Sequence, residues 1–175
     1  MKRLGILFVI SAPSGAGKST ICSSLRQTPD TVYAVSCTTR TPRAGETDGE
    51  DYHFMEATDF QRRIGAGDFL EYARVHDHYY GTLRQSIVDT LRAGTDVLVD
   101  IDVQGAKTIR KSTDPFISDS LVDIFIMPPS LEELRHRLEK RGTESAGQID
   151  FRLTNAAAEM KCWREYKYTI ISGSM

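Results

Sequence analysis

A short run of small, polar and cationic residues offers the first chemistry in this sequence. Residues 12–19 read Ala-Pro-Ser-Gly-Ala-Gly-Lys-Ser, directly after an apolar stretch at 4–10. The run matches the phosphate-binding pattern G-x-x-x-x-G-K-[ST] at every fixed position except the first, where Ala12 replaces glycine. In such a loop the backbone N–H groups turn inward around phosphates, and the following helix adds the positive end of its dipole. We therefore expect Lys18 to reach the β- and γ-phosphates of a nucleotide and the Ser19 hydroxyl to bind Mg²⁺.

Two arginines and two tyrosines form a second candidate group, suited to an anion. Arg40 and Arg43 stand three residues apart in a predicted loop at 40–51. Guanidinium groups grip an oxyanion with paired hydrogen bonds, and the phenols of Tyr52 and Tyr80 can donate to the same anion. A solvated pair of surface arginines fits the same pattern, so the spacing leaves both interpretations open.

Three carboxylates complete the candidates. Glu71 lies within the otherwise apolar stretch 69–73, where a buried polar contact and the exposed face of an alternating strand are equally good explanations. Asp100 and Asp102 end a predicted strand, and alternation places both on one face. The carboxyl edge of a parallel sheet is where open α/β folds bind ligands, although two exposed carboxylates at a strand end are the alternative.

Alternating strands and helices must position these groups. We predict strands at residues 4–10, 32–38, 52–55, 69–75, 79–81, 96–101, 121–127 and 168–171. Helices are expected at residues 17–27, 58–65, 83–92, 104–111, 130–140 and 148–166. Thr58 is the expected N-cap of its helix, and Ser130 with Glu133 predicts a capping box. The middle third lacks the βαβ rhythm, so the pattern predicts an open α/β sheet with an inserted lobe at roughly 33–93.

Composition excludes several classes of protein. The chain has 175 residues, and 22 Lys+Arg against 24 Asp+Glu give a net charge of −2, which argues against a general nucleic-acid binder. No apolar run approaches the roughly 20 residues of a membrane span. Three cysteines without a C-x-x-C pattern favour a reducing cytoplasm. His76 and His78 share a face but lack a third ligand nearby, so we expect no zinc site.

Several blocks of this sequence resemble guanylate kinases, in the order seen in that family. They are Ser-Ala-Pro-Ser-Gly-Ala-Gly-Lys-Ser-Thr, Thr-Thr-Arg-Thr-Pro-Arg-Ala-Gly-Glu, Gly-Glu-Asp-Tyr-His-Phe, Phe-Leu-Glu-Tyr-Ala, Tyr-Tyr-Gly-Thr, Asp-Ile-Asp-Val-Gln-Gly and Arg-Leu-Glu-Lys-Arg-Gly-Thr-Glu. The resemblance covers residues 4–171. It implies an α/β fold with a P-loop NTPase core, whose parallel sheet is flanked by helices, an inserted mixed α/β GMP-binding lobe and a small lid. The implied ranges are 1–32, 94–136 and 150–175 for the core, 33–93 for the lobe and 137–149 for the lid.

The resemblance also implies roles for the candidate residues. ATP binding is implied for Ala12, Pro13, Ser14, Gly15, Ala16, Gly17, Lys18, Ser19 and Thr20. GMP binding is implied for Ser36, Arg40, Arg43, Tyr52, Glu71, Tyr80, Gly81, Thr82, Asp100 and Asp102, with Glu71 accepting from the N1–H and 2-amino groups of guanine. Catalysis is implied for Lys18 and for the phosphate-closing arginines Arg137, Arg141 and Arg152. Mg²⁺, which accompanies ATP as phosphoryl donor, is expected at Ser19 and Asp100, partly through water.

The implied reaction is transfer of the ATP γ-phosphoryl group to GMP, giving ADP and GDP. The attacking GMP phosphate oxygen is already anionic, so the step needs alignment and charge neutralisation rather than a general base. The expected partners are these small nucleotides, without nucleic acid or membrane, and the oligomeric state stays open. The alternatives are a kinase-dead guanylate-kinase-like binding module and a P-loop kinase for another small substrate.

Two departures from the family pattern lie near the C-terminal end. Ser172-Gly173-Ser174 stands where relatives usually carry Asn-Asp-Asp, which leaves the adenine contacts open. The sequence ends at Met175, whereas guanylate kinases generally continue into one more helix.

Overall fold

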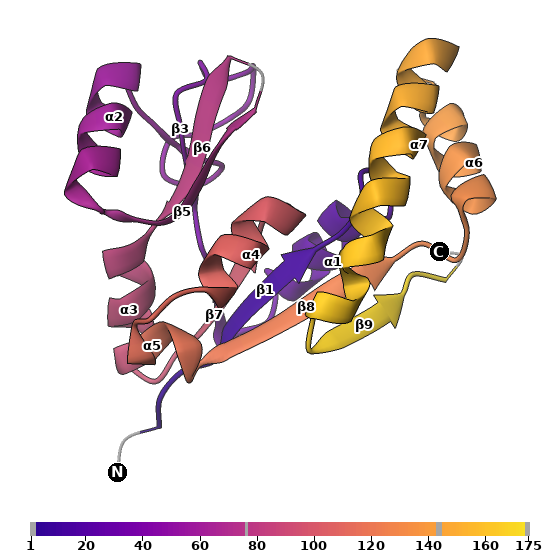
Figure 1. Cartoon of the computed structure of the whole chain (residues 1–175). Helices are drawn as coiled ribbons and strands as arrows, with labels where there is room; N and C mark the ends of the chain where they lie inside the picture. The colour runs from indigo at the N-terminus through magenta and orange to yellow at the C-terminus, as the bar shows by residue number, and fades with distance from the viewer. Residues whose placement is uncertain (1–2, 76, 143–144, 174–175) are drawn as a thin grey trace.

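Two β-sheets organise the chain, which is described here by a computed structural model covering residues 3–75, 77–142 and 145–173 (Figure 1). The larger sheet is wholly parallel, with the order β2-β7-β1-β8-β9. Its strands are β1 (Leu7–Ser11), β2 (Thr31–Tyr33), β7 (Asp96–Asp100), β8 (Leu121–Met127) and β9 (Tyr168–Ile171). The smaller, mixed sheet has the order β4-β3-β6-β5. Its strands are β3 (Cys37–Thr38), β4 (His53–Phe54), β5 (Phe69–Val75) and β6 (His78–Leu83).

The helices flank the larger sheet and complete the lobe. They are α1 (Lys18–Leu25), α2 (Ala57–Ala66), α3 (Arg84–Arg92), α4 (Val103–Arg110), α5 (Pro115–Ser118), α6 (Leu131–Arg141) and α7 (Ala146–Met160), followed by a 3-10 helix (Lys161–Glu165). Figure 1 shows the smaller sheet with α2 at the upper left and the α6–α7 pair at the upper right, with α4 between them. The predicted fold class, a parallel α/β core with an inserted mixed lobe, is therefore confirmed.

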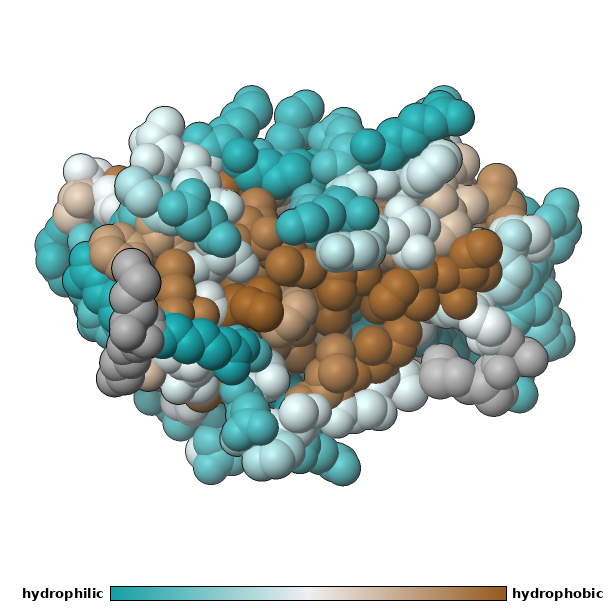
Figure 2. Space-filling model, turned by 90° about the horizontal axis from the view of Figure 1, so that it is seen from below, coloured by the Kyte–Doolittle hydropathy of each residue, from teal (hydrophilic) through white to brown (hydrophobic). Residues whose placement is uncertain are grey.

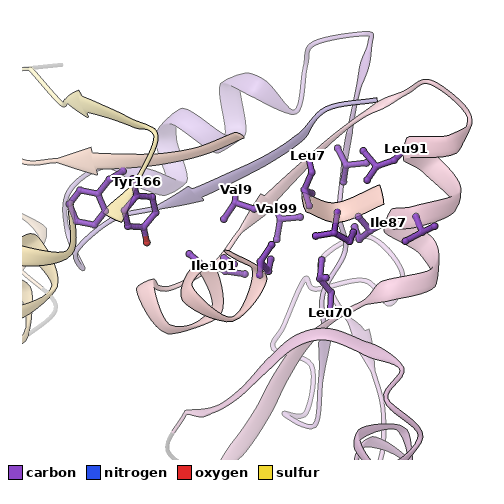
Figure 3. Close-up of a cluster of buried hydrophobic side chains, with 14 residues drawn as sticks. Leu7, Val9, Leu70, Ile87, Leu91, Val99, Ile101 and Tyr166 are labelled. Carbon is purple, nitrogen blue, oxygen red and sulfur yellow. The ribbon is translucent and has the colours of Figure 1, made fainter. Parts of the chain in front are cut away.

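The main hydrophobic core joins the lobe to the larger sheet. Leu7 and Val9 of β1 pack with Val99 of β7, and α3 contributes Ile87 and Leu91 to the same cluster (Figure 3). Leu70 of β5, from the lobe, lies in this cluster as well (Figure 3). Burying a Leu or Val side chain stabilises a fold by about 1.5–3 kcal/mol, so this shared cluster fixes the root of the lobe against the core. The packing also ties α3, within the range expected for the lobe, to the larger sheet.

The predicted strand at 32–38 is wrong, because the chain changes sheets within it. Residues 31–33 pair with β7, and the Ala34 N–H still donates to the Leu98 carbonyl at 2.9 Å. Cys37 and Thr38 instead pair with β4 and β6 in the lobe. A run of strand-forming residues carries no information about its partner, so the pattern concealed the point where the chain leaves the core.

Several predicted ends of helices are also corrected. Glu56 rather than Thr58 precedes α2, and the long helix predicted at 148–166 gives way to the 3-10 helix after Met160. The capping box at Ser130 is half formed: its hydroxyl accepts from the Glu133 N–H at 3.1 Å, but the Glu133 carboxylate bonds Arg137 instead. The short α5 was not predicted. His76 of the expected turn, Thr143 and Glu144 of the expected lid, and Ser174 lie outside the described residues.

One face of the molecule gathers apolar residues. Figure 2, seen from below, shows a band of hydrophobic residues between hydrophilic margins. Strand β9 lies at the edge of the larger sheet and is exposed along its length, including Ile170 and Ile171. Within the described residues, no helix combines the length and the apolar character that crossing a membrane requires.

Candidate active site

The loop between β1 and α1 has the conformation that a phosphate cradle requires. Gly15 and Gly17 adopt φ values of 91° and 94°, which side chains other than glycine rarely adopt. A Cβ atom on Gly15 would also lie 2.9 Å from the Leu134 side chain of α6. Ala12, the one departure from the loop pattern, is buried and packs with Ile10 in a core cluster below the loop. Alanine is therefore compatible with this position.

A cavity of about 330 Å³ opens over this loop. It is lined by Ala12, Pro13, Ser14, Gly15, Gly17, Lys18, Ser19, Asp102, Arg141 and Glu159. Most of the expected ATP-binding residues thus come together in one place. Thr20 instead faces a neighbouring cavity of about 570 Å³, with Arg137, Arg141 and other residues of α6. Ala16 is buried and offers its backbone carbonyl to Arg137 at 3.4 Å.

Lys18 connects the loop with a second cavity. Its ammonium nitrogen donates to the Ile101 carbonyl at 3.0 Å and lies 2.5 Å from Asp100 Oδ1. The second cavity, of about 170 Å³, is lined by Lys18, Ser36, Tyr52, Glu71, Ala73, Val75, Tyr80, Gly81, Asp100, Ile101 and Asp102. Because Lys18 and Asp102 line both cavities, a ligand in one can approach a ligand in the other.

Glu71 is the buried acid of the second cavity. It is 5% exposed and accepts a hydrogen bond from the Thr82 hydroxyl at 2.7 Å. Burial raises the pKa of Glu71 to about 6, with a smaller contribution from the Asp102 charge, while the Thr82 hydrogen bond opposes the shift. The exposed-strand alternative for Glu71 is therefore wrong, and the chain holds a desolvated carboxylate with acceptor capacity to spare.

Two glycines allow other segments to pack closely against Glu71: Gly105 from α4 of the core and Gly81 from the neighbouring strand β6 of the lobe. A Cβ atom on Gly105 of α4 would lie 2.9 Å from Glu71 Oε2, and one on Gly81 would lie 3.0 Å from the Glu71 carbonyl oxygen. Gly105 was not among the predicted site residues. Its signal was present in the block Asp-Ile-Asp-Val-Gln-Gly, whose last residue it is, but the spacing gave no reason to connect it with Glu71.

Arg40 and the two tyrosines form a compact group beside the second cavity. The Arg40 guanidinium lies 5.4 Å from the Tyr52 ring centre, and the Tyr52 and Tyr80 rings meet edge to face at 5.9 Å. Glu46 holds Arg40 in place through an ion pair at 2.7 Å. Burial raises the pKa of Tyr52, so its phenol stays protonated and able to donate. Arg43 is exposed, and it contacts this group through its backbone N–H, which donates to the Glu46 carboxylate at 2.7 Å.

Asp102 reaches the site in a different way from the one predicted. Strand β7 ends at Asp100, and Asp102 is the N-cap of α4, where its carboxylate accepts from the Gly105 N–H at 2.7 Å. The two acids still line one cavity, but a helix cap rather than strand alternation places the second one.

The three candidate arginines of α6 and α7 differ in their partners. Arg152 donates to the Ser14 hydroxyl of the phosphate loop at 2.7 Å. Arg141 is exposed and lines the loop cavity, and no ion pair joins it to an acid among the described residues. Arg137 is bonded to Glu133, to the loop and to the segment after β9. The structure thus brings all three to the loop, with only Arg141 facing the cavity without an acidic partner in the described part of the chain.

The loop cavity also has a carboxylate that sequence analysis missed. Glu159 of α7 lines it together with Ser19. Burial raises the pKa of Glu159, and the Asp102 charge adds to the shift. Nothing in the sequence near Glu159 distinguishes it from other acids of a long helix, so its place became visible only from the packing of α7 beside the loop.

The protein oxygen atoms in this site suit a metal ion that is also bound by water and by nucleotide phosphates. Within the described residues, no group of three or more His, Cys, Asp or Glu side chains could form a metal cage. Ser19 and Asp102 nevertheless line the loop cavity, and Asp100 lines the second cavity together with Asp102. Mg²⁺ usually keeps several waters and shares one or two protein oxygens with substrate phosphates, which this set can provide.

This chain is similar to guanylate kinases in sequence and in structure. A model of the guanylate kinase family matches residues 5–175. Guanylate kinases from Caldanaerobacter subterraneus subsp. tengcongensis and Clostridioides difficile are 44% and 45% identical over 98% and 96% of this chain, and over 82% and 80% of their own lengths. The crystal structure of guanylate kinase from Anaplasma phagocytophilum is similar with a TM-score of 0.75 and 33% identity, over 99% of this chain and 80% of that one.

Proposed function

The chain belongs to the guanylate kinase family, and from this premise we propose that it transfers the γ-phosphoryl group of ATP to GMP, giving ADP and GDP. One observation of its geometry carries most weight. Lys18 and Asp102 line both the phosphate-loop cavity and the cavity that contains Glu71. A donor phosphate and an acceptor phosphate bound in the two cavities would therefore meet at Lys18.

The donor side works through backbone and cationic groups. The N–H groups of the loop and the first turn of α1 cradle the donor phosphates, and the Lys18 ammonium neutralises charge on the group in transfer. Arg141, which faces the loop cavity, adds a second cation as the donor binds. These groups supply alignment and charge stabilisation.

The acceptor side works through Glu71 and the tyrosines. Ionised Glu71 accepts from the N1–H and 2-amino groups of guanine, while Thr82 fixes its orientation. Adenine lacks both donors, so it would leave the remaining acceptor sites of the buried carboxylate unsatisfied, which costs about 1–3 kcal/mol or more. Arg40, Tyr52 and Tyr80 supply donors for the GMP phosphate, whose oxygen attacks without loss of a proton. Asp100 holds the Lys18 ammonium at the junction of the two cavities.

Magnesium is the cofactor that fits this site. When bound with ATP, it supplies neutralisation of the β- and γ-phosphate charge. Ser19 would hold it directly, and Asp100 would hold it partly through water. We also propose a cytoplasmic enzyme, because all three cysteines, Cys22, Cys37 and Cys162, are free thiols, as expected in a reducing compartment.

A coupled assay of ADP formation tests the proposal. Purified protein with ATP and Mg²⁺ is given GMP, dGMP or AMP, and Arg135→Ala serves as a matched variant because Arg135 pairs with Asp150 away from both cavities. We expect rapid ADP formation with GMP, slow formation with AMP, and near-wild-type turnover for Arg135→Ala.

Each alternative function predicts a different result. A binding module of the guanylate-kinase-like type would bind GMP in a calorimeter and form no ADP. A P-loop kinase for another substrate would turn over ATP with an acceptor other than GMP. Absence of GMP-dependent ADP formation under saturating ATP and Mg²⁺ would contradict the proposed function.

A further inference from the structure

All the N–H donors of the Arg137 guanidinium form hydrogen bonds with other groups of the protein. An arginine side chain has five N–H donors. Arg137 Nε donates to Glu133 at 2.8 Å, Nη1 to the Ala16 carbonyl at 3.4 Å and the Ser172 hydroxyl at 3.0 Å, and Nη2 to the carbonyls of Ser172 at 3.1 Å and Gly173 at 3.0 Å. No donor is left for a phosphate while these bonds are in place.

The charge of Arg137 is also balanced within the protein. Its side chain is 16% exposed and forms an ion pair with Glu133, four residues earlier on α6. Arg141, one helical turn later, is exposed and pairs with no acid among the described residues. The two arginines of α6 therefore differ in how readily they can bind a phosphate. Arg141 can approach an incoming phosphate, whereas Arg137 would first have to break its existing hydrogen bonds.

The partners of Arg137 connect three segments that are far apart in the sequence. Ala16 lies in the phosphate loop, Arg137 on α6, and Ser172 with Gly173 directly after β9. Ser172 is itself anchored, because it is 6% exposed and its N–H donates to the Met127 carbonyl of β8 at 2.8 Å. Through Arg137, the end of the larger sheet is joined to the carbonyl side of the phosphate loop.

We propose that Arg137 is a positioning residue for the donor nucleotide and not a contact of the transferred phosphoryl group. It fixes the loop around Ala16 and the segment 172–173 before ATP binds. This inference rests on the proposed function and changes the role that the family resemblance implies for Arg137. A preorganised loop binds ATP without first being ordered, so the effect of Arg137 falls on donor affinity.

The inference separates two kinds of kinetic effect. Loss of a positioning contact should raise the KM and Kd of ATP by about tenfold or more and leave kcat within about threefold, because ground state and transition state lose the same preorganisation. Loss of a contact with the transferred group should instead lower kcat by about 10²-fold. A general loss of folded protein would lower kcat through the active fraction and leave the KM unchanged.

The test compares Arg137→Ala and Arg137→Lys with Arg135→Ala, a variant of the same helix whose arginine pairs with Asp150. Amide hydrogen exchange is measured on the nucleotide-free proteins, ATP binding is measured by calorimetry without GMP, and steady-state kinetics are measured with both nucleotides. We expect faster exchange at residues 14–17 and 168–173 in both Arg137 variants, with weaker ATP binding and an unchanged GMP KM. Lysine should rescue little, because its ammonium cannot bridge three segments. Arg135→Ala should match the wild type.

Two results would overturn the inference. Wild-type exchange in the nucleotide-free Arg137 variants would do so, as would a kcat reduced by about 10²-fold with unchanged ATP binding. If both Arg137 variants fail to fold, Ser172→Ala removes one acceptor with little change in packing, and the same readouts should move in the same direction by a smaller factor. Calorimetry and hydrogen exchange do not require GMP, so they test the role of Arg137 independently of the proposed function. A chain that binds ATP without phosphorylating GMP would contradict the proposed function, and the role of Arg137 could still be tested.

Discussion

The two cavities of this molecule present different kinds of groups to a ligand. Around Glu71, side chains are already paired: Glu71 with Thr82 and Arg40 with Glu46. The phosphate-loop cavity is instead lined by the loop itself and by the long cations Lys18 and Arg141, which come from separate elements. The acceptor cavity sits between the lobe and the core, whereas the loop cavity is bordered by α6 and α7.

Under the proposed function, this difference suits the chemistry of the two ligands. A base is read by a few directional hydrogen bonds, which discriminate well only when the protein group is buried and fixed. A triphosphate presents delocalised charge, which is met by many N–H donors and by cations that can move with it. Under the proposed function, we therefore expect the buried, hydrogen-bonded Glu71 to determine base selectivity and the cations beside the loop to determine turnover.

The largest effect should come from Lys18, which belongs to both cavities. Lys18→Met should lower kcat by about 10³-fold, the upper range for loss of one preorganised charge-stabilising donor. It should also raise the KM of GMP, because Asp100 loses its partner and faces the acceptor cavity as an unbalanced charge. Steady-state kinetics with each nucleotide varied measure both. Normal turnover, or an unchanged GMP KM, would show that Lys18 does not link the two sites.

Arg141 should affect the loop cavity and spare the other. Arg141→Ala should lower kcat by about 10²-fold, as expected for a lost charge contact in the transition state. The ratio of kcat/KM for GMP over AMP should not change, because Arg141 does not line the cavity of Glu71. Parallel steady-state assays of Arg141→Ala, Arg135→Ala and the wild type measure both kcat and this ratio. A turnover within about threefold of the wild type would remove Arg141 from the mechanism.

Glu71 should show the opposite behaviour, affecting base selectivity more than turnover. Glu71→Gln keeps the shape but replaces an acceptor by a donor facing guanine, so the preference for GMP over AMP should fall by about 10- to 10²-fold through loss of one charge-assisted bond. Competition between GMP and AMP in one assay measures the ratio. An unchanged preference would mean that another group reads the base.

The smallest expected effect concerns stability and follows from the raised pKa of Glu71, about 6 against an ordinary 4.5. Between these values the folded state binds the proton that the unfolded state has released, so stability falls as the pH rises from 4.5 through 6. A shift of this size corresponds to about 2 kcal/mol. Glu71→Gln should therefore be more stable than the wild type at pH 7, and the difference should shrink by pH 5. Urea unfolding at both pH values measures it; a constant difference would contradict the raised pKa.

Much of this molecule was predictable from local pattern. The glycine-rich loop follows from its spacing, and the structure confirms that it joins a buried strand to a helix. The hairpin of β5 and β6 and the parallel core were also predictable, because alternation and continuous apolar runs report burial directly. For Glu71 and Arg40, the pattern left surface alternatives open, and the resemblance of whole blocks favoured the site.

Contacts between segments that are distant in the sequence became visible only in the tertiary structure, because hydrophobic periodicity does not encode them. The sequence shows a strand-forming run at 32–38 but not that β2 and β3 belong to different sheets. It shows three arginines but not that Arg137 is bonded to Ala16 and Ser172 while Arg141 has no acidic partner in the described part of the chain. It places Glu71 and Gly105 34 residues apart (105 − 71), whereas packing of α4 against β5 leaves no room for a Cβ between them. The physical reason is the same in each case: residue type fixes what a side chain can bind, and the long-range packing of the elements selects which partner comes within a few ångströms.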